Sequence, residues 1–181
     1  MAAKPSIAFV IAFENFRDEE FFVPYEHLKG KADCEVFSTK TGMARGKLGG
    51  TFKVDKLIDA INPQAFDAIV YIGGPGTPSV RAYPKAVEKA KEMNAGGKSV
   101  CAICWAPTIL AKAGVLAGRK ATCWLGFDDE YGIPTDKVLM KYGAVYEKKG
   151  AVQDGKIITA DGPEHAKDFA LLIGKALGLD K

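Results

Sequence analysis

The sequence contains few of the residues on which several common kinds of site depend. Only two of its 181 residues are histidines, His27 and His165, and only four are cysteines. A structural zinc site needs four thiolate or imidazole ligands, usually supplied as closely spaced pairs. Apart from Cys101 and Cys104, no two of these residues are close in the chain. The sequence therefore predicts no metal site, and its cysteines do not form the pattern of a secreted disulfide scaffold.

Long apolar runs and runs of charge are also missing. Glu14, Arg17 and Asp18 interrupt the apolar stretch near the N-terminus, so this stretch cannot span a bilayer, and no small-residue cleavage site follows it. The net charge is +3, and residues of both signs are spread along the chain without a basic stripe. We therefore expect a cytoplasmic protein that binds neither nucleic acid nor membranes.

The composition of the chain is typical of one globular α/β domain spanning 1–181. Hydrophobic residues make up 48% and charged residues 26%, and the length suits a single sizeable core. Apolar, β-rich segments alternate with helical patterns, which predicts a mostly parallel sheet sandwiched by helices. Strands are expected within 6–13, 34–39, 66–76, 98–103 and 119–124, with a hairpin at 42–55 and short strands over 144–160. Helices are expected at 17–31, 83–97, 106–116, 135–143 and 162–177.

Two strand ends are candidates for a site, because ligands in such folds bind beyond the carboxyl ends of the strands. "YIGGPG" (71–76) ends one strand in a glycine-rich turn, and "VCAICWAP" (100–107) joins another strand to a helix. The glycine-rich turn lacks the spacing of a P-loop or a GxGxxG motif. We therefore expect no phosphate site there, and no cofactor.

The cysteines of "VCAICWAP" allow more than one interpretation. Three extended residues separate Cα atoms by roughly 10 Å, whereas a disulfide needs less than about 7 Å, which argues against a redox pair. Cys104 between a strand and a helix fits a nucleophile on a turn, with a thiol pKa lowered by the helix start. The alternative is a buried structural cysteine, which is what we expect of Cys34, Cys101 and Cys123.

Other groups near these strand ends could serve a nucleophile. The backbone N–H groups of Gly74 and Trp105 are the expected oxyanion donors, since Pro75 has no N–H. The acidic run 18–20 follows the first strand, and one of its carboxyl groups turned inward would partner the thiol. The alternative is that all three acids are solvated at a helix start.

The segments "AIVYIGGPG" and "VCAICWAPTILAKAGVLAGRKAT" resemble the DJ-1/PfpI (ThiJ) superfamily over nearly the whole chain. The resemblance implies a flavodoxin-like, class I glutamine-amidotransferase-like fold and a homo-oligomer, a dimer or larger. It implies that Cys104 is the reactive cysteine and that Glu20 is the carboxylic acid beside it. It also implies that the N–H groups of Gly74 and Trp105 are the oxyanion donors. A protonated Glu20 would hydrogen-bond the sulfur.

The chain departs from the family pattern where that pattern has histidine. In the peptidase branch a histidine follows the cysteine and a neighbouring subunit supplies a glutamate, but the matching residues here are Trp105 and Pro78. In the glyoxalase-like branch a histidine stands at the position of Trp124. His165, close to Pro163, is the one substitute, and the alternative for it is a solvent-facing residue at a helix start. Trp124, Pro163 and His165 are the candidate pocket residues, and the two tryptophans either rim the pocket or only pack.

Two functions follow from these expectations. The first is a cysteine-dependent enzyme that attacks a small electrophile in a stress response, such as a reactive aldehyde (glyoxalase or deglycase chemistry) or a nitrile-like carbon. The second is a non-catalytic oxidative-stress sensor or chaperone-like protein that uses the same cysteine. Peptidase activity is not expected, because the Cys-His-Glu triad is not matched.

Overall fold

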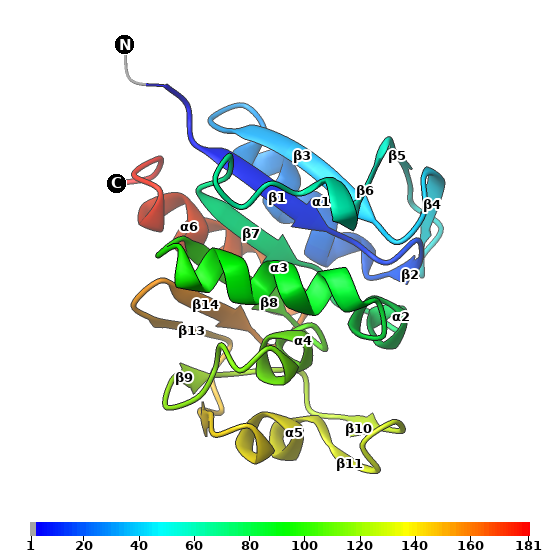
Figure 1. The fold of residues 1–181 in the computed structure, drawn as a ribbon, viewed down its shortest axis with the longest axis vertical. Coiled ribbons are helices and arrows are strands. Elements are labelled where there is room, and N and C mark those ends of the chain that lie inside the picture. Colours follow the sequence, from blue (N-terminus) through cyan, green and yellow to red (C-terminus); the bar gives the residue numbers. More distant parts are fainter. Residues whose placement is uncertain (1–2) are drawn as a thin grey trace.

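A computed structural model describes residues 3–181, and its centre is a seven-stranded sheet (Figure 1). In chain order the strands of this sheet are β1 (Ser6–Val10), β3 (Asp33–Ser38), β6 (Lys56–Leu57), β7 (Ala68–Tyr71), β8 (Ser99–Ile103), β13 (Ala151–Asp154) and β14 (Ile157–Ala160). Their spatial order is β13-β14-β8-β7-β1-β3-β6, and only β13 runs antiparallel to its neighbour. The central strands β7 and β8 are buried along their whole length, as their apolar sequences require.

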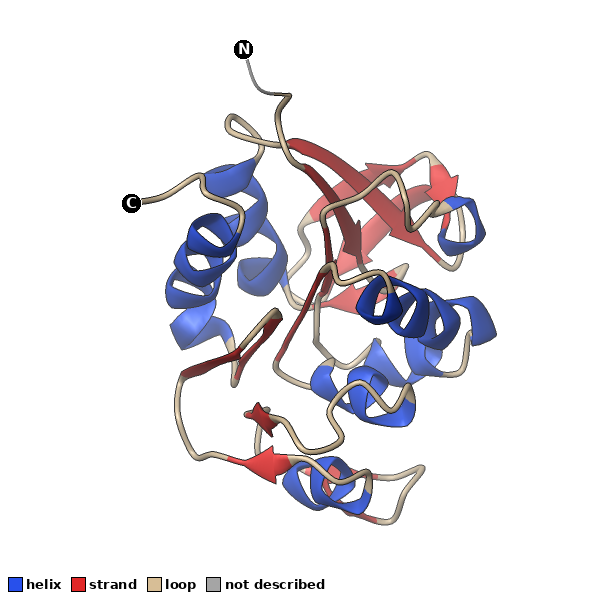
Figure 2. Cartoon of the chain, turned by 60° about the vertical axis from the view of Figure 1, so that its left-hand side comes forward, coloured by secondary structure: helices blue, strands red, loops and turns tan. Residues whose placement is uncertain are grey.

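Helices cover both faces of this sheet, as Figure 2 shows with the sheet seen close to its edge. One face carries α1 (Asp18–Leu28) beside α6 (Ala166–Ala176), and the other carries α2 (Thr77–Arg81), α3 (Pro84–Ala95) and α4 (Pro107–Lys112). The predicted fold, a single α/β domain with a mostly parallel sheet between helices, is confirmed. The carboxyl ends of β7 and β8 adjoin each other, so the two strand ends singled out in the sequence meet at one edge.

Shorter elements complete the domain. A separate sheet contains β2 (Glu14–Phe16), β4 (Gly42–Gly46) and β5 (Thr51–Val54), and β4 with β5 is the predicted hairpin. The remaining elements are β9 (Lys120–Ala121), β10 (Phe127–Asp128), β11 (Ile133–Pro134), α5 (Thr135–Lys141), β12 (Val145–Tyr146) and the 3-10 turns Ile58–Ala60 and Pro163–His165. No helix within residues 3–181 has both the length and the hydropathy of a membrane span.

Several boundaries differ from those predicted. The strand expected over 119–124 is only the two-residue β9, because the chain then turns toward the end of β8, where the Trp124 N–H donates to the Cys104 carbonyl (2.7 Å). The helix expected over 106–116 ends at Lys112, and Gly114 follows with a φ of 75°. Helix α2 and the β10–β11 pair were not predicted, since their sequences are short and rich in turn-forming residues.

Candidate functional site

Cys104 occupies a strained turn between β8 and α4. Its φ is 64°, and Asn15 is the one other non-glycine residue in 3–181 with a positive φ. A left-handed backbone costs an L-residue roughly 1–2 kcal/mol. Two hydrogen bonds hold it there: the Cys104 N–H donates to the Ala160 carbonyl (2.8 Å), and its carbonyl accepts from Trp124. This is the geometry of a nucleophile elbow, which presents a side chain at the carboxyl edge of the sheet.

Two backbone N–H groups point at the sulfur of Cys104. They belong to Gly74 and Trp105, and both hydrogen bonds lower the thiol pKa. Gly74 has a φ of 110°, and a Cβ there would lie 2.5 Å from the Arg17 nitrogen and 2.7 Å from the Asn15 carbonyl oxygen. Only glycine fits this position, so the turn after β7 can bring its N–H close to the thiol.

Glu20 reaches the thiol from α1. Its side chain is 0% exposed, and its Oε2 accepts a hydrogen bond from the Gly73 N–H (3.2 Å). A Cβ on Gly73 would lie 2.8 Å from that oxygen and 2.7 Å from the Cys104 Cβ, so the missing side chain lets carboxyl and thiol approach. The other oxygen, Oε1, is buried without a well-formed hydrogen bond within the described chain, although a weaker interaction with the Cys104 thiol lowers the carboxyl pKa.

Burial controls the protonation of this pair. It raises the pKa of Glu20 to about 8, against smaller lowering effects of Cys104, Arg17 and the Gly73 N–H, so the carboxyl group is protonated at neutral pH. Burial also raises the pKa of the Cys104 thiol, and the nearby Glu20 carboxylate adds to this rise, while the two N–H groups only partly oppose it. The predicted lowering of the thiol pKa is therefore wrong, because the sulfur is buried and lies beside the carboxyl group of Glu20.

The other two acids of the run 18–20 point elsewhere. Asp18 accepts hydrogen bonds from the N–H groups of Leu48 (2.8 Å) and Gly50 (2.7 Å), in the turn between β4 and β5. Glu19 pairs with Arg17 (2.9 Å). Successive helix residues differ in direction by about 100°, so only Glu20 faces the thiol.

Cys104 opens into a cavity of about 410 Å³, a size suited to a small organic ligand. The predicted pocket residues Trp124 and Pro163 line it, as does Trp105. Two cations that the sequence did not single out, Arg17 and Lys47, also line it. Lys47 lies in the β4–β5 turn, far from Cys104 in the sequence, and no sequence signal placed it here.

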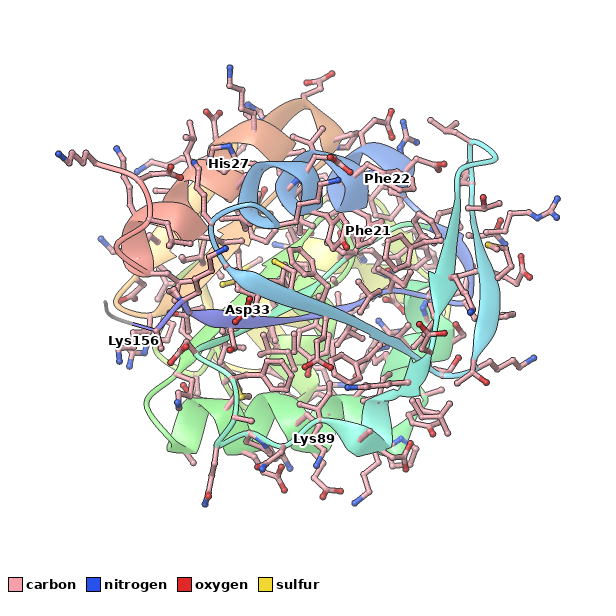
Figure 3. All side chains as sticks on the ribbon, turned by 90° about the horizontal axis from the view of Figure 1, so that it is seen from above. Phe21, Phe22, His27, Asp33, Lys89 and Lys156 are labelled. Atoms are coloured by element: carbon pink, nitrogen blue, oxygen red, sulfur yellow. The ribbon has the colours of Figure 1, made fainter. Side chains whose placement is uncertain are left out.

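Neither histidine lines this cavity. The 3-10 turn Pro163–His165 brings Pro163 to the cavity and leaves His165 outside the lining, with Nδ1 bonded to Asp161 Oδ1 (2.6 Å). His27 lies on α1 on the side next to α6 (Figure 3), and its Nε2 contacts Asp180 Oδ2 at 2.7 Å. The substitution of His165 for the missing family histidine is thus not supported by its position.

The other three cysteines do not line this cavity. All four cysteines are free, so Cys101 and Cys104 form no disulfide. Cys101 and Cys123 are fully buried, and burial raises the pKa of each thiol. Cys34, expected in the core, is only partly buried, because β3 lies near the edge of the sheet.

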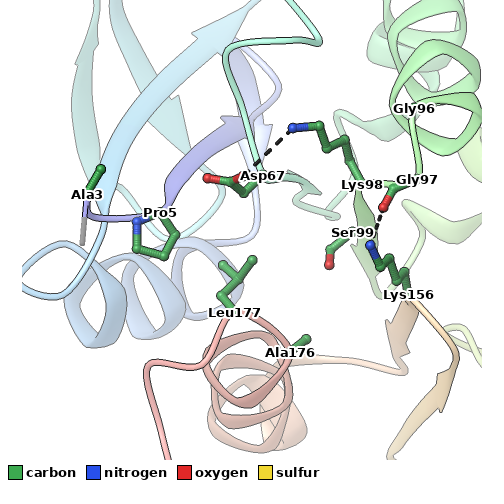
Figure 4. Close-up of a pocket in the computed structure, with 10 residues that line it drawn as sticks. All are labelled: Ala3, Pro5, Asp67, Gly96, Gly97, Lys98, Ser99, Lys156, Ala176 and Leu177. Atoms are coloured by element: carbon green, nitrogen blue, oxygen red, sulfur yellow. Dashed lines mark hydrogen bonds and ion pairs between the residues drawn. The ribbon is translucent and has the colours of Figure 1, made fainter.

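A second cavity, of about 560 Å³, lies at the opposite edge of the sheet (Figure 4). It is bordered by residues that precede or begin the parallel strands, among them Asp67, Lys98, Ser99 and Lys156. Lys98 faces Asp67 (3.7 Å), and Lys156 donates to the Gly97 carbonyl (2.5 Å). Ligands in open α/β sheets bind at the carboxyl ends of strands, so the candidate site is the cavity at Cys104. Within the described chain, no group of three or more histidine, cysteine or acidic residues is placed to hold a metal ion.

Comparisons with known proteins cover almost the whole chain. Residues 5–176 match the model of the DJ-1/PfpI family. The chain is 39% identical to an uncharacterized protein of Methanocaldococcus jannaschii, over 94% of this chain and 82% of that protein. It is 37% identical to Deglycase PfpI of Pyrococcus furiosus, over 87% of this chain and 90% of the relative. The crystal structure of a ThiJ/PfpI domain protein from Brachyspira murdochii has a TM-score of 0.85 at 28% identity, covering 98% of this chain and 97% of that one.

Proposed function

Because this chain belongs to the DJ-1/PfpI family, we propose that it is a cysteine-dependent enzyme acting on a small reactive aldehyde of the glyoxal type. The observation that carries the proposal is the convergence of Glu20 and two backbone N–H groups on the sulfur of Cys104, at a cavity of ligand size. The name of the Pyrococcus furiosus relative, a deglycase, supports chemistry on aldehydes and their glycation products.

The first step is addition of the Cys104 sulfur to the aldehyde carbon. Glu20, as carboxylate, takes the thiol proton while the S–C bond forms and the C=O π pair moves onto oxygen. The N–H groups of Gly74 and Trp105 stabilise the developing negative charge. Glu20 then gives the proton to that oxygen, and the product is a thiohemiacetal with Glu20 again ionised.

The second step converts the thiohemiacetal of a 2-oxoaldehyde into a thioester. Glu20 takes the proton from the former aldehyde carbon and gives it to the oxygen of the neighbouring carbonyl group, which forms an enediol. Glu20 then takes the proton of the other enediol hydroxyl group as the thioester C=O forms, and it delivers that proton to the neighbouring carbon. Water then hydrolyses the thioester, which releases a 2-hydroxy acid and restores the thiol of Cys104. The net reaction adds one water to the 2-oxoaldehyde and needs no oxidant. Glu20 carries every proton transfer, because no imidazole lines the cavity.

The test is conversion of methylglyoxal to lactate by purified protein. We expect turnover by the wild type and by Cys34→Ser, whose thiol is outside this cavity, and none above background by Cys104→Ser. Because the pKa of Glu20 is raised to about 8, kcat/KM should rise as the pH increases through that value. Glu20→Gln should lower kcat/KM by at least about a hundredfold. Equal activity of wild type and Cys104→Ser would contradict the proposal.

A second candidate is a peroxide sensor, which the lack of an imidazole at the cavity favours. Hydrogen peroxide would oxidise Cys104 to the sulfenic and then the sulfinic acid, each step transferring one oxygen atom to sulfur and releasing water. Protonated Glu20 would hydrogen-bond the sulfinate. Mass spectrometry after peroxide treatment tests this: two oxygens should be added at Cys104 in the wild type and far fewer in Glu20→Leu.

Three further properties belong to the proposal. Peptidase activity is not expected, since Trp105 and Pro78 stand where the peptidase branch has its histidine and glutamate. We propose that the protein forms a homo-oligomer, which light scattering would test. The cytoplasmic location stays a prediction.

A further inference from the structure

The indole of Trp105 is held by a buried ion pair. Its Nε1–H donates to Asp128 Oδ2 (2.8 Å), and the Asp128 carboxylate also accepts two hydrogen bonds from Arg81 (2.6 and 2.9 Å). Both side chains of the ion pair are 0% exposed. The indole N–H thus has one fixed, charged acceptor, which limits how the ring next to Cys104 can turn.

Arg81 is itself fixed by groups from other elements. It donates to Thr108 Oγ1 on α4 (2.8 Å) and to Glu130 Oε2 (2.8 Å), and its guanidinium lies over the Tyr131 ring (4.8 Å to the centroid). Asp128 is therefore held by Arg81, whose other contacts do not involve Trp105.

Trp124 places a second indole against the first. The ring centroids are 5.2 Å apart with planes tilted by 44°. The Trp124 ring lies over Gly126, where a Cβ would collide with it, and its backbone N–H is bonded to the Cys104 carbonyl. Trp124 remains 37% exposed, so part of its aromatic surface is left accessible beside the cavity.

The cavity is larger than a three-carbon aldehyde requires, and its walls carry more apolar surface than such a small molecule can contact. A volume of about 410 Å³ accommodates a ring as well as a reacting carbonyl group. Pro75 and Pro163 add apolar surface beside the two indoles. A flat aromatic group stacked on indole contributes on the order of a tenfold gain in affinity beyond its burial.

Resting on the proposed function, we infer that the site prefers aldehydes with an aromatic substituent, with Trp105 and Trp124 as the specificity-determining wall and Asp128 as the residue that positions Trp105. The chemistry is that of the proposed reaction: phenylglyoxal and water give mandelate. The ring stacks on the indoles while the aldehyde carbon reaches Cys104.

Binding can be measured without turnover, because the only two tryptophans of the chain both line the cavity. The probe is acetophenone, an unreactive aromatic ketone, compared with acetone in titrations of protein with 15N-labelled tryptophan. We expect acetophenone to shift both indole N–H signals and to bind at least about tenfold more tightly than acetone. Trp124→Ala should weaken the binding of acetophenone about tenfold and leave the binding of acetone unchanged. Gly126→Ala, which displaces the Trp124 ring, should also weaken the binding of acetophenone.

The matched control is Phe127→Ala, which removes an exposed aromatic side chain outside the cavity and should leave both affinities unchanged. Equal binding of acetophenone and acetone, or unchanged acetophenone binding by Trp124→Ala, would overturn the inference. In the activity assay, the phenylglyoxal to methylglyoxal ratio of kcat/KM should fall about tenfold in Trp124→Ala, through KM. If methylglyoxal is not converted but acetophenone still binds as expected, the proposed function fails and this inference stands.

The positioning role of Asp128 has its own readout. In the wild type the Trp105 indole N–H should exchange slowly with solvent, and in Asp128→Ala it should exchange fast while acetophenone affinity falls severalfold. A folded Asp128→Ala protein with unchanged acetophenone affinity would contradict this role. If Asp128→Ala does not fold, Trp105→Phe removes the same hydrogen bond but keeps a ring, and it should show the same loss of affinity.

Discussion

The environment of a single residue, Glu20, ties the chemistry of the site to the stability of the protein. Gly73 lacks a side chain at the point where the carboxyl of Glu20 and the thiol of Cys104 meet. Both groups are buried where they meet, and this burial raises the pKa of the Glu20 carboxyl group and of the Cys104 thiol. Both groups hold their protons at neutral pH, and the pair begins to ionise near the pKa of Glu20, about 8.

This raised pKa predicts a pH dependence of folding. Between the ordinary pKa of 4.5 and about 8, Glu20 binds a proton in the folded state but not in the unfolded state. Its contribution to stability is therefore complete below pH 4.5 and is lost as the pH rises to about 8, at up to about 1.4 kcal/mol per pH unit. Urea denaturation across this range should show a flatter profile for Glu20→Gln than for wild type. Parallel profiles would mean that Glu20 is ionised in the folded protein.

At the scale of elements, hydrogen bonds join the turn between β4 and β5 to the start of α1. Asp18 is almost fully buried and accepts the N–H groups of Leu48 and Gly50, and side chains at Gly46 or Gly50 would collide with its carboxylate. The same turn carries Lys47 to the cavity. The start of α1 thus positions both Glu20 beside the Cys104 thiol and Lys47 at the wall of the cavity.

Loss of the hydrogen bonds to Asp18 should make the β4–β5 turn more mobile. Asp18→Ala removes an acceptor of two charge-assisted hydrogen bonds, and we expect a loss of about 2 kcal/mol in unfolding free energy. Hydrogen exchange at the amides of Leu48 and Gly50 should accelerate. Glu19→Ala removes an acid from the same helical turn but only a half-exposed ion pair, so it should change stability by less than about 1 kcal/mol and leave those amides protected.

Across the whole molecule, one buried ion pair joins distant segments. Arg81 lies on α2, Asp128 on β10 and Thr108 on α4. Although burial opposes it, hydrogen bonds from Arg81 and Trp105 hold the pKa of Asp128 below its usual range, so the carboxylate stays ionised. The short β10–β11 segment is thereby anchored to the main domain next to the cavity.

The ion pair should be strongly coupled. Arg81→Met leaves the Asp128 carboxylate without its buried partner and should lower the unfolding free energy by about 3–5 kcal/mol, as should Asp128→Leu. The double variant Arg81→Met with Asp128→Leu should lose far less unfolding free energy than the two single variants lose together. A double-mutant cycle from denaturation curves measures this, and additive losses would show that the two side chains act independently.

Much of the fold followed from local pattern. The buried strands β7 and β8 are continuous apolar runs, and helix α3 is bounded by Pro84 and the glycines after it. Their alternation predicted parallel strands, and parallel strands bring their carboxyl ends to one edge. Short elements such as α2 and the β10–β11 pair were missed, because their few residues leave no period in the sequence.

The sequence by itself determined the elbow at Cys104 and the side-chain-free turn that faces it, since both depend on residues adjacent in the chain. The residue pattern left open which acid of the run 18–20 meets the thiol, and the family resemblance implied Glu20. The tertiary structure places Glu20 there, because the choice depends on how α1 is rotated against the sheet. It also decided that the thiol pKa rises, since burial is contributed by segments far apart in the sequence. The positions of His165, Lys47 and Asp128 relative to the cavity were decided in the same way, because no local pattern encodes a distance across the domain.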